Sequence, residues 1–279
     1  MDFWKPLLGF LATEATAPEA YGLYHIVWLA LIAGLTVFAV LQGRKHNAET
    51  VNRVVFLTAV VVFALEIYKQ FVFTFGDGSG EASYSWYAFP FQFCSTPMYI
   101  GLIAAVTKNE ALHRRLCAYL ASYSLFAGIS VMAYPVSVFT DTVGINIQTM
   151  VWHGGMIAMG IVLLRTGYVR ASLGTVIQAF PVFLTLVTAA AVMNELAHRT
   201  GLLATETFNM FFISPYCAPS LPVYSMIQPH VTFPVSVLVY VAGFTAAAMI
   251  VLLLCRLAHI DAPAAKHHPF WNFRWRLAH

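Results

Sequence analysis

The sequence predicts an all-α membrane protein: a polytopic bundle of about seven transmembrane helices in a single domain over 1–279. Three observations support this. Of the 279 residues, 59% are hydrophobic and only 10% are charged, which is more apolar surface than a soluble core of this length can bury. Several apolar stretches reach the roughly 20 residues that a helix needs to cross a bilayer. Lys and Arg also gather between alternate stretches, as in multi-pass proteins.

Each stretch is expected to be a helix, because backbone groups inside lipid must satisfy their hydrogen bonds within the protein. The predicted helices cover 22–42, 54–75, 88–106, 114–135, 145–165, 172–194 and 235–258. A long outer loop over 195–234 is rich in proline and aromatic residues, and a basic and aromatic tail over 259–279 follows the last helix. The sequence thus predicts a multi-pass protein of the cell membrane.

The positions of the cations predict the orientation, because positively charged loops stay on the cytoplasmic side. The cations after helices one, three, five and seven are Arg44, Lys45, Arg53, Lys108, Arg114, Arg115, Arg165, Arg170, Arg256, Lys266, Arg274 and Arg276. The charged residues on the opposite face are mainly acidic: Asp77, Glu81, Asp141, Glu206, and the cations Lys5 and Arg199. We therefore expect the N-terminus outside and the C-terminus in the cytoplasm. The net charge of +3 then reflects topology, and no nucleic-acid partner is expected.

Ionisable residues within the predicted helices need a partner or a purpose, because each costs about 3 kcal/mol in a bilayer. Glu66 and Lys69 are three residues apart on helix two, so they share a face and can neutralise each other. They form either a structural ion pair or part of a polar cavity that orients a substrate. His153 lies in helix five, and Glu195 lies near the end of helix six.

Cys94 lies between two prolines in the segment Phe-Pro-Phe-Gln-Phe-Cys-Ser-Thr-Pro, residues 89–97. Pro97 cannot donate to the carbonyl of Phe93, so we expect a kinked third helix with a freed carbonyl beside the thiol. The cysteine is either a reactive thiol or a small packing residue.

His153 precedes Gly154 and Gly155, which allow another helix to approach closely. Histidine can be the base that turns a thiol into a nucleophile. At a rise of about 1.5 Å per residue, Cys94 lies about 9 Å and His153 about 12 Å below the outer helix ends. The shared depth predicts a catalytic dyad, although a histidine bonded to a neighbouring helix fits the same pattern.

No metal and no cofactor are expected. The sequence lacks a His-x-x-x-His pair, a Cys-x-x-Cys pair, a phosphate-binding glycine loop and a Gly-x-Ser-x-Gly elbow. Metal ligands could come only from scattered residues such as His25, Glu66 and His153. The four cysteines are not spaced as a disulfide framework.

Four features of the sequence occur together in one known family. They are Pro90-Phe91-Gln92-Phe93-Cys94-Ser95, His153, Asn194 and Thr207-Phe208-Asn209-Met210-Phe211-Phe212. In these features the chain resembles the YwaF-like integral membrane proteins, a family that includes eukaryotic transmembrane protein 164. The likeness spans about 20–258.

The resemblance implies a membrane acyltransferase in which Cys94 accepts a fatty acyl chain as a thioester and His153 assists. Membrane phospholipid and lysophospholipid would be the substrates. The chain departs from the family pattern at 91–93, where a leucine-rich stretch with histidine is expected, and at 208–210, where Asn-Tyr-Met is expected. These departures bear on headgroup and acceptor specificity.

A complete site also needs groups that stabilise an oxyanion and bind the substrate. The candidates are Asn194, which ranks first, Gln92, Asn209, Glu66 and Lys69. Water as the acceptor would make the protein a lipid hydrolase. Two other classes stay open: a transporter or channel with a polar path through Glu66, Lys69 and His153, and a structural membrane subunit.

Overall fold

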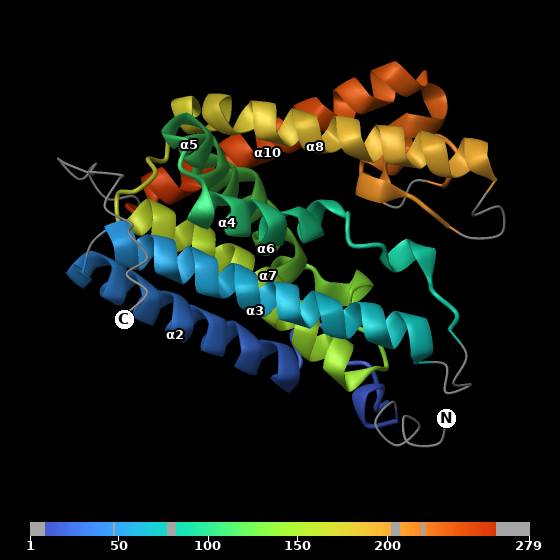
Figure 1. Ribbon diagram of the computed structural model, residues 1–279, viewed down its shortest axis with the longest axis horizontal. Coiled ribbons are helices and arrows are strands. Elements are labelled where there is room, and N and C mark those ends of the chain that lie inside the picture. Colours follow the sequence, from blue (N-terminus) through green and yellow to red (C-terminus); the bar gives the residue numbers. More distant parts are fainter. Residues whose placement is uncertain (1–8, 47, 77–81, 202–206, 219–220, 261–279) are drawn as a thin grey trace.

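The computed structural model describes residues 9–46, 48–76, 82–201, 207–218 and 221–260, which form a bundle of helices (Figure 1). Among these residues the β-structure is a single isolated bridge between Glu14 and Thr142. The predicted tail beyond residue 260 lies outside the described residues. The same holds for the charges at Lys5, Asp77, Glu81, Glu206, Lys266, Arg274 and Arg276. The described part of the chain is therefore the all-α bundle that the sequence predicts.

Within the described residues, six helical runs are long and apolar enough to cross a membrane. They are α2 (Leu23–His46), α3 (Ala48–Phe75), the continuous run Glu110–Ala133, α7 (Val143–Arg165), α8 (Leu173–Thr200) and α10 (Phe233–Leu257). The run Glu110–Ala133 consists of α5 (Glu110–Tyr119), the π-helical turn η3 (Leu120–Ser124) and α6 (Leu125–Ala133). The predictions for six of the seven helices are confirmed, with shifted ends. Because α8 continues to Thr200, the outer loop begins later than predicted.

The third helix differs from the prediction of a full crossing over 88–106. Only α4 (Thr96–Val106) is α-helical, and two short 3₁₀ turns precede it at η1 (Trp86–Ala88) and η2 (Phe93–Ser95). Its 11 residues span about 17 Å, roughly half the hydrocarbon thickness. The physical reason is Pro97, which lies in the first turn of α4, where a missing N–H costs nothing. The proline therefore starts a helix rather than kinking one.

Two carbonyl groups of the segment before α4 accept hydrogen bonds from side chains of the bundle. Gln70 Nε2 donates to the Ala88 carbonyl at 2.8 Å, and the Tyr99 hydroxyl donates to the Pro90 carbonyl at 3.0 Å. Irregular backbone at membrane depth is tolerated only where protein or a water-filled cavity surrounds it. These bonds explain how residues 83–95 depart from helical structure inside the bundle.

Helix α7 lies at the centre, with α2, α3 and α6 packed around it (Figure 1). A Cβ atom at Gly154 would lie 2.6 Å from Ile32 of α2, and one at Gly155 would lie 3.0 Å from Thr58 of α3. The prediction that these glycines allow close helix approach is confirmed. Gly128 of α6 meets α7 in the same way, because a Cβ atom there would lie 2.9 Å from the His153 carbonyl oxygen.

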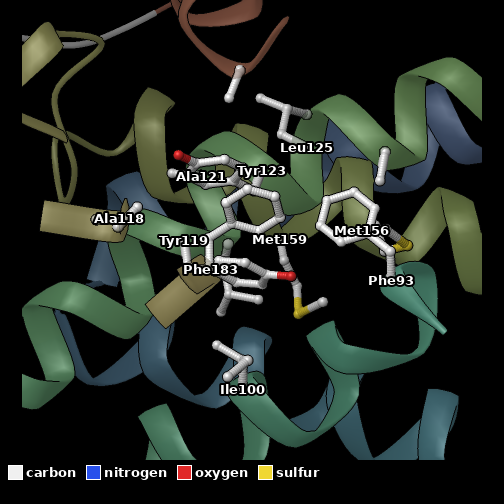
Figure 2. Close-up of a cluster of buried hydrophobic side chains, with 14 of the residues drawn as sticks. Phe93, Ile100, Ala118, Tyr119, Ala121, Tyr123, Leu125, Met156, Met159 and Phe183 are labelled. Carbon is white, nitrogen blue, oxygen red and sulfur yellow. The ribbon is translucent and has the colours of Figure 1, made fainter. Parts of the chain in front are cut away.

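A second packing centre joins η2, α4, α5, η3, α7 and α8. Figure 2 shows its buried side chains, with the rings of Phe93, Tyr119, Tyr123 and Phe183 gathered beside Met156 and Met159. Tyr123 stacks on Phe183 with ring centroids 4.3 Å apart, and Phe93 meets Phe183 edge-on at 5.8 Å. This cluster fixes Phe93, and with it the start of α4.

The helix ends that carry the predicted cytoplasmic cations meet at one end of the bundle. The Arg165 guanidinium, at the end of α7, donates to the His259 carbonyl just after α10 at 2.7 Å. Asn52, near the start of α3, donates to the Ala105 carbonyl near the end of α4 at 3.0 Å. This arrangement agrees with the predicted alternation of inner and outer ends.

Candidate functional site

Cys94 lies in the 3₁₀ turn η2, immediately before α4. Its thiol is free and half-buried. The prediction of a freed Phe93 carbonyl beside the thiol is wrong, because both the backbone N–H and the hydroxyl of Thr96 donate to that carbonyl, the hydroxyl at 2.9 Å. The turn therefore presents the thiol at the N-terminal end of a helix with its neighbouring carbonyl satisfied.

Trp152 connects the cysteine to α7. Its indole Nε1 donates to the carbonyl oxygen of Cys94 at 2.6 Å. The third and fifth predicted helices are therefore neighbours, a relationship that the sequence alone leaves open. Trp152 is itself buried, so the contact holds the cysteine turn against α7, on which His153 is the next residue.

His153 is buried, and its two ring nitrogens differ in their partners. Nδ1 lies 2.9 Å from the Thr149 carbonyl oxygen, one turn earlier on α7. Since a carbonyl can only accept, Nδ1 carries the proton and Nε2 is left as an acceptor. Nε2 has no hydrogen-bond partner among the described residues, so no such bond joins it to the Cys94 thiol. The imidazole thus has the tautomer of a base, and its pairing with the thiol stays a prediction.

Glu66 and Lys69 form the ion pair that their spacing predicts. Lys69 Nζ lies 2.8 Å from Glu66 Oε1, and both side chains are largely buried. Lys69 Nζ also lies 5.9 Å from the ring centre of Trp152, and it interacts electrostatically with both Cys94 and His153. The second carboxylate oxygen, Glu66 Oε2, has no partner within the described chain. The pair therefore lies beside the candidate dyad.

Gln70 is a member of this network that the sequence pattern did not single out. Its side-chain amide donates to Glu66 Oε1 and to the Ala88 carbonyl, and its Oε1 accepts from the Tyr84 hydroxyl. The signal was present in the sequence, since Gln70 follows Glu66 by one helical turn and therefore shares its face. Gln70 ties α3 to the segment that leads to Cys94.

The amides of Gln92, Asn194 and Asn209 are brought together around the segment Phe208–Ser214. Asn194 exchanges two hydrogen bonds with the backbone of Met210, at 2.7 and 3.0 Å. Gln92 accepts from the Phe211 N–H at 3.0 Å and donates to the Asn209 carbonyl at 3.1 Å. Asn209 Oδ1 accepts from the Ser214 N–H at 2.9 Å. In this conformation the amides hold a loop, and their role as oxyanion donors stays a prediction.

That loop has an unusual backbone. Phe211 and Phe212 have φ of 59° and 58°, in the left-handed region that bulky residues rarely adopt. Phe211 is fully buried, and its ring meets those of Phe91 and Phe93 at 5.9 and 5.6 Å. Strained backbone persists only where its surroundings impose it. Here the amide bonds and the ring packing impose it directly beside the cysteine turn.

His25 is not part of this group. Its Nδ1 accepts from the Tyr21 N–H at 3.0 Å, so its Nε2 donates to the Met132 carbonyl at 3.1 Å. These bonds fasten the start of α2 to the end of α6. Among the described residues, no three His, Cys, Asp or Glu side chains are grouped to hold a metal ion.

Comparison with known proteins identifies a family. The model of the TMEM164 family matches residues 20–260. This is the range over which the sequence resembles transmembrane protein 164 and its relatives, so that resemblance is confirmed. No curated protein and no solved structure matches the chain.

Proposed function

The chain belongs to the TMEM164 family of membrane proteins, and on that premise we propose that it is an acyltransferase of the cell membrane. Cys94 accepts a fatty acyl chain from a phospholipid as a thioester, and the chain then passes to a lysolipid-type acceptor. His153 is the base of both steps. Glu66 and Lys69 set the charge around the dyad.

The observation that carries the proposal is the state of His153 Nε2. Its lone pair is buried and without a partner among the described residues, while Nδ1–H is fixed by the Thr149 carbonyl. An unpaired buried acceptor costs free energy, so it needs an explanation such as a catalytic role. In unliganded sites catalytic hydrogen bonds are often longer than in the substrate complex. Trp152 is hydrogen-bonded to Cys94, and His153 is the next residue on α7. The proton-accepting nitrogen of His153 is suited to receive the thiol proton.

The position of the thiol also supports nucleophilic chemistry. Cys94 lies at the N-terminal end of α4, where the partial positive charge of the helix favours a thiolate. Lys69 adds a positive charge nearby. A thiolate is the form of cysteine that attacks an ester carbonyl.

The depth of the site fits a substrate that enters from lipid. His153 lies ten residues below the start of α7 at Val143, and Lys69 lies six residues from the end of α3 at Phe75. At about 1.5 Å per residue these positions are about 15 and 9 Å below the outer helix ends. Lipid esters and the upper acyl chains of the outer leaflet lie at a comparable level.

The test is acylation of the purified protein. The full chain is placed in vesicles with phospholipid that carries a labelled acyl chain, and the label on Cys94 is sought by mass spectrometry and by release with hydroxylamine. We expect a labelled thioester in the wild type, none in Cys94→Ser, and a strongly slowed reaction in His153→Ala. Cys217→Ser is the matched control, since Cys217 is also half-buried and free. Transfer that persists in both site variants would refute the dyad.

The same experiment separates the alternatives. Release of free fatty acid without transfer to an added lysolipid would identify a hydrolase. A pH-dependent flux that requires Glu66 and does not require Cys94 would identify a transporter. Loss of a partner complex, with neither activity, would indicate a structural subunit.

A further inference from the structure

Tyr240 of α10 has a buried hydroxyl that lacks a hydrogen-bond partner among the described residues. The residue is 2% exposed, and its Oη makes no hydrogen bond there. Two other buried tyrosines use theirs: the Tyr123 hydroxyl bonds to Thr245 at 2.9 Å, and the Tyr119 hydroxyl bonds to Thr96 at 2.7 Å. Because buried tyrosine hydroxyls normally find a partner, the one on Tyr240 needs a separate explanation.

Ring packing places Tyr240 close to the cysteine turn. Its ring stacks on Phe244 with centroids 4.2 Å apart, and Phe244 meets Phe93 edge-on at 4.9 Å. Phe93 immediately precedes Cys94 and belongs to the cluster in Figure 2. Tyr240 also interacts electrostatically with Cys94 and with Tyr119. The phenol and the thiol therefore lie in the same region of the bundle, although they come from α10 and η2.

The depth of Tyr240 agrees with that of the dyad. It lies seven residues after Phe233, where α10 begins at the outer end. The distance along the helix is about 10 Å, between the depths of Lys69 and His153. The hydroxyl is therefore at the membrane level where an ester group bound to the site would lie.

Several donors around Cys94 already have an acceptor. The Thr96 hydroxyl donates to the Phe93 carbonyl, so in the 2.7 Å bond between Thr96 and Tyr119 the tyrosine is the donor. The amides of Gln92 and Asn194 are bonded to the loop backbone. Tyr87 also interacts with Cys94 but is 53% exposed, so water competes for its hydroxyl. Tyr240 differs from these groups, because its hydroxyl is buried and has no acceptor in the described part of the chain.

We propose that the Tyr240 hydroxyl is the oxyanion donor of this site. The inference rests on the proposed acyl transfer and adds a catalytic residue to it. As His153 Nε2 takes the proton from Cys94 Sγ, the sulfur bonds to the ester carbonyl carbon and the π electron pair of the carbonyl moves to its oxygen. That oxygen accepts a hydrogen bond from Tyr240, which keeps its proton throughout. When the carbonyl re-forms, the carbon–oxygen bond to glycerol breaks, and the leaving oxygen takes the proton from His153.

The experiment compares Tyr240→Phe with Tyr123→Phe in the acylation assay, together with thermal unfolding of each variant. Loss of one oxyanion donor slows catalysis about 10²- to 10³-fold, so we expect Tyr240→Phe to lower kcat by that factor with little change in KM. Its thermal stability should be unchanged or higher, because the hydroxyl that is removed has no partner. Tyr123 stacks on the same ring, Phe183, but its hydroxyl is bonded. Tyr123→Phe should therefore lose stability and keep the wild-type kcat.

The outcomes distinguish the two proposals. If the wild type acylates Cys94 and Tyr240→Phe does so at the wild-type rate, the oxyanion assignment is wrong and the acyl transfer stands. A slowed Tyr87→Phe beside a normal Tyr240→Phe would assign the donor to Tyr87 and also overturn the inference. A loss of kcat in Tyr240→Phe that parallels a loss of folded protein would show a structural role instead. If the wild type forms no thioester, both proposals fail.

Discussion

The indole nitrogen of Trp152 donates a 2.6 Å hydrogen bond to the backbone carbonyl of Cys94. Trp152 immediately precedes His153, the proposed base, and Cys94 is the proposed nucleophile. One contact between α7 and the turn before α4 therefore connects the two parts of the proposed dyad. Neither residue type would suggest this role by itself, since tryptophan in a transmembrane helix is commonly a packing residue. The contact can be tested directly.

Replacing Trp152 with phenylalanine keeps an aromatic ring and removes the donor. We expect the variant to lose about 1–3 kcal/mol of stability, because a buried carbonyl loses a partner, and to form the Cys94 thioester more slowly. Thermal unfolding and the acylation assay measure the two effects. Trp28→Phe on α2 is the control and should leave acylation unchanged; equal rates in all three proteins would exclude a positioning role for Trp152.

Asn194 should stabilise the outer loop through its two bonds to Met210. We expect Asn194→Ala to cost about 2–4 kcal/mol, since the buried N–H and carbonyl of Met210 both lose their partner. Hydrogen exchange at the Met210 amide should accelerate well before the helices exchange. Thr188→Ala, on the exposed side of the same helix, should change neither quantity. Unaltered exchange at Met210 in Asn194→Ala would contradict the assignment.

The ion pair between Glu66 and Lys69 predicts strong coupling in a double-mutant cycle. Glu66→Gln and Lys69→Met each leave a largely buried charge without its partner, and each should cost about 2–4 kcal/mol. The double variant should be more stable than the sum of the two losses predicts, by about 1–3 kcal/mol. The exposed pair of Glu110 and Arg114 is the control, with an expected coupling below about 1 kcal/mol. Additive losses at Glu66 and Lys69 would mean that the pair contributes nothing to stability.

Gly128→Ala should disturb His153 from the opposite helix. The added Cβ would lie 2.9 Å from the His153 carbonyl oxygen, and backbone cannot yield as a flexible side chain can. We expect a loss of about 1–3 kcal/mol and slower acylation. Gly243→Ala on α10, where nothing lies within 4 Å, should keep both properties or gain slightly in stability. The prediction fails if the two alanine variants behave alike.

Hydropathy predicted the long helices well because it measures how apolar a segment is, and a bilayer accepts mainly apolar segments. It failed at 88–106, where the composition is apolar but Pro97 starts a helix and side chains bond to the carbonyls of Ala88 and Pro90 before it. A proline in the first turn is a recognised start signal. The sequence thus contained the information, although the apolar composition concealed it.

The candidate site was predictable in part, for a different reason. Matching depths along the predicted helices group Cys94 with His153, and helical spacing pairs Glu66 with Lys69. The contacts of Trp152 and Lys69 place these residues in one region. The contribution of Tyr240 could not be predicted, because an aromatic residue in an apolar helix gives no sign of whether its hydroxyl is bonded. Likewise, the amides of Gln92 and Asn194 could be assigned to the loop backbone only once their hydrogen-bond partners were known.

The half-length of α4 leaves two pieces of chain without α-helix in the outer part of the bundle, the segment 83–92 and the segment Phe208–Ser214. Neither segment belongs to the six helical runs of the described chain that are long and apolar enough to cross the membrane. Under the proposed function, substrate preference and membrane insertion would then belong to different parts of the chain, and each could vary without the other. A related protein that acts on a different lipid would be expected to differ in these two segments and to keep the same scaffold.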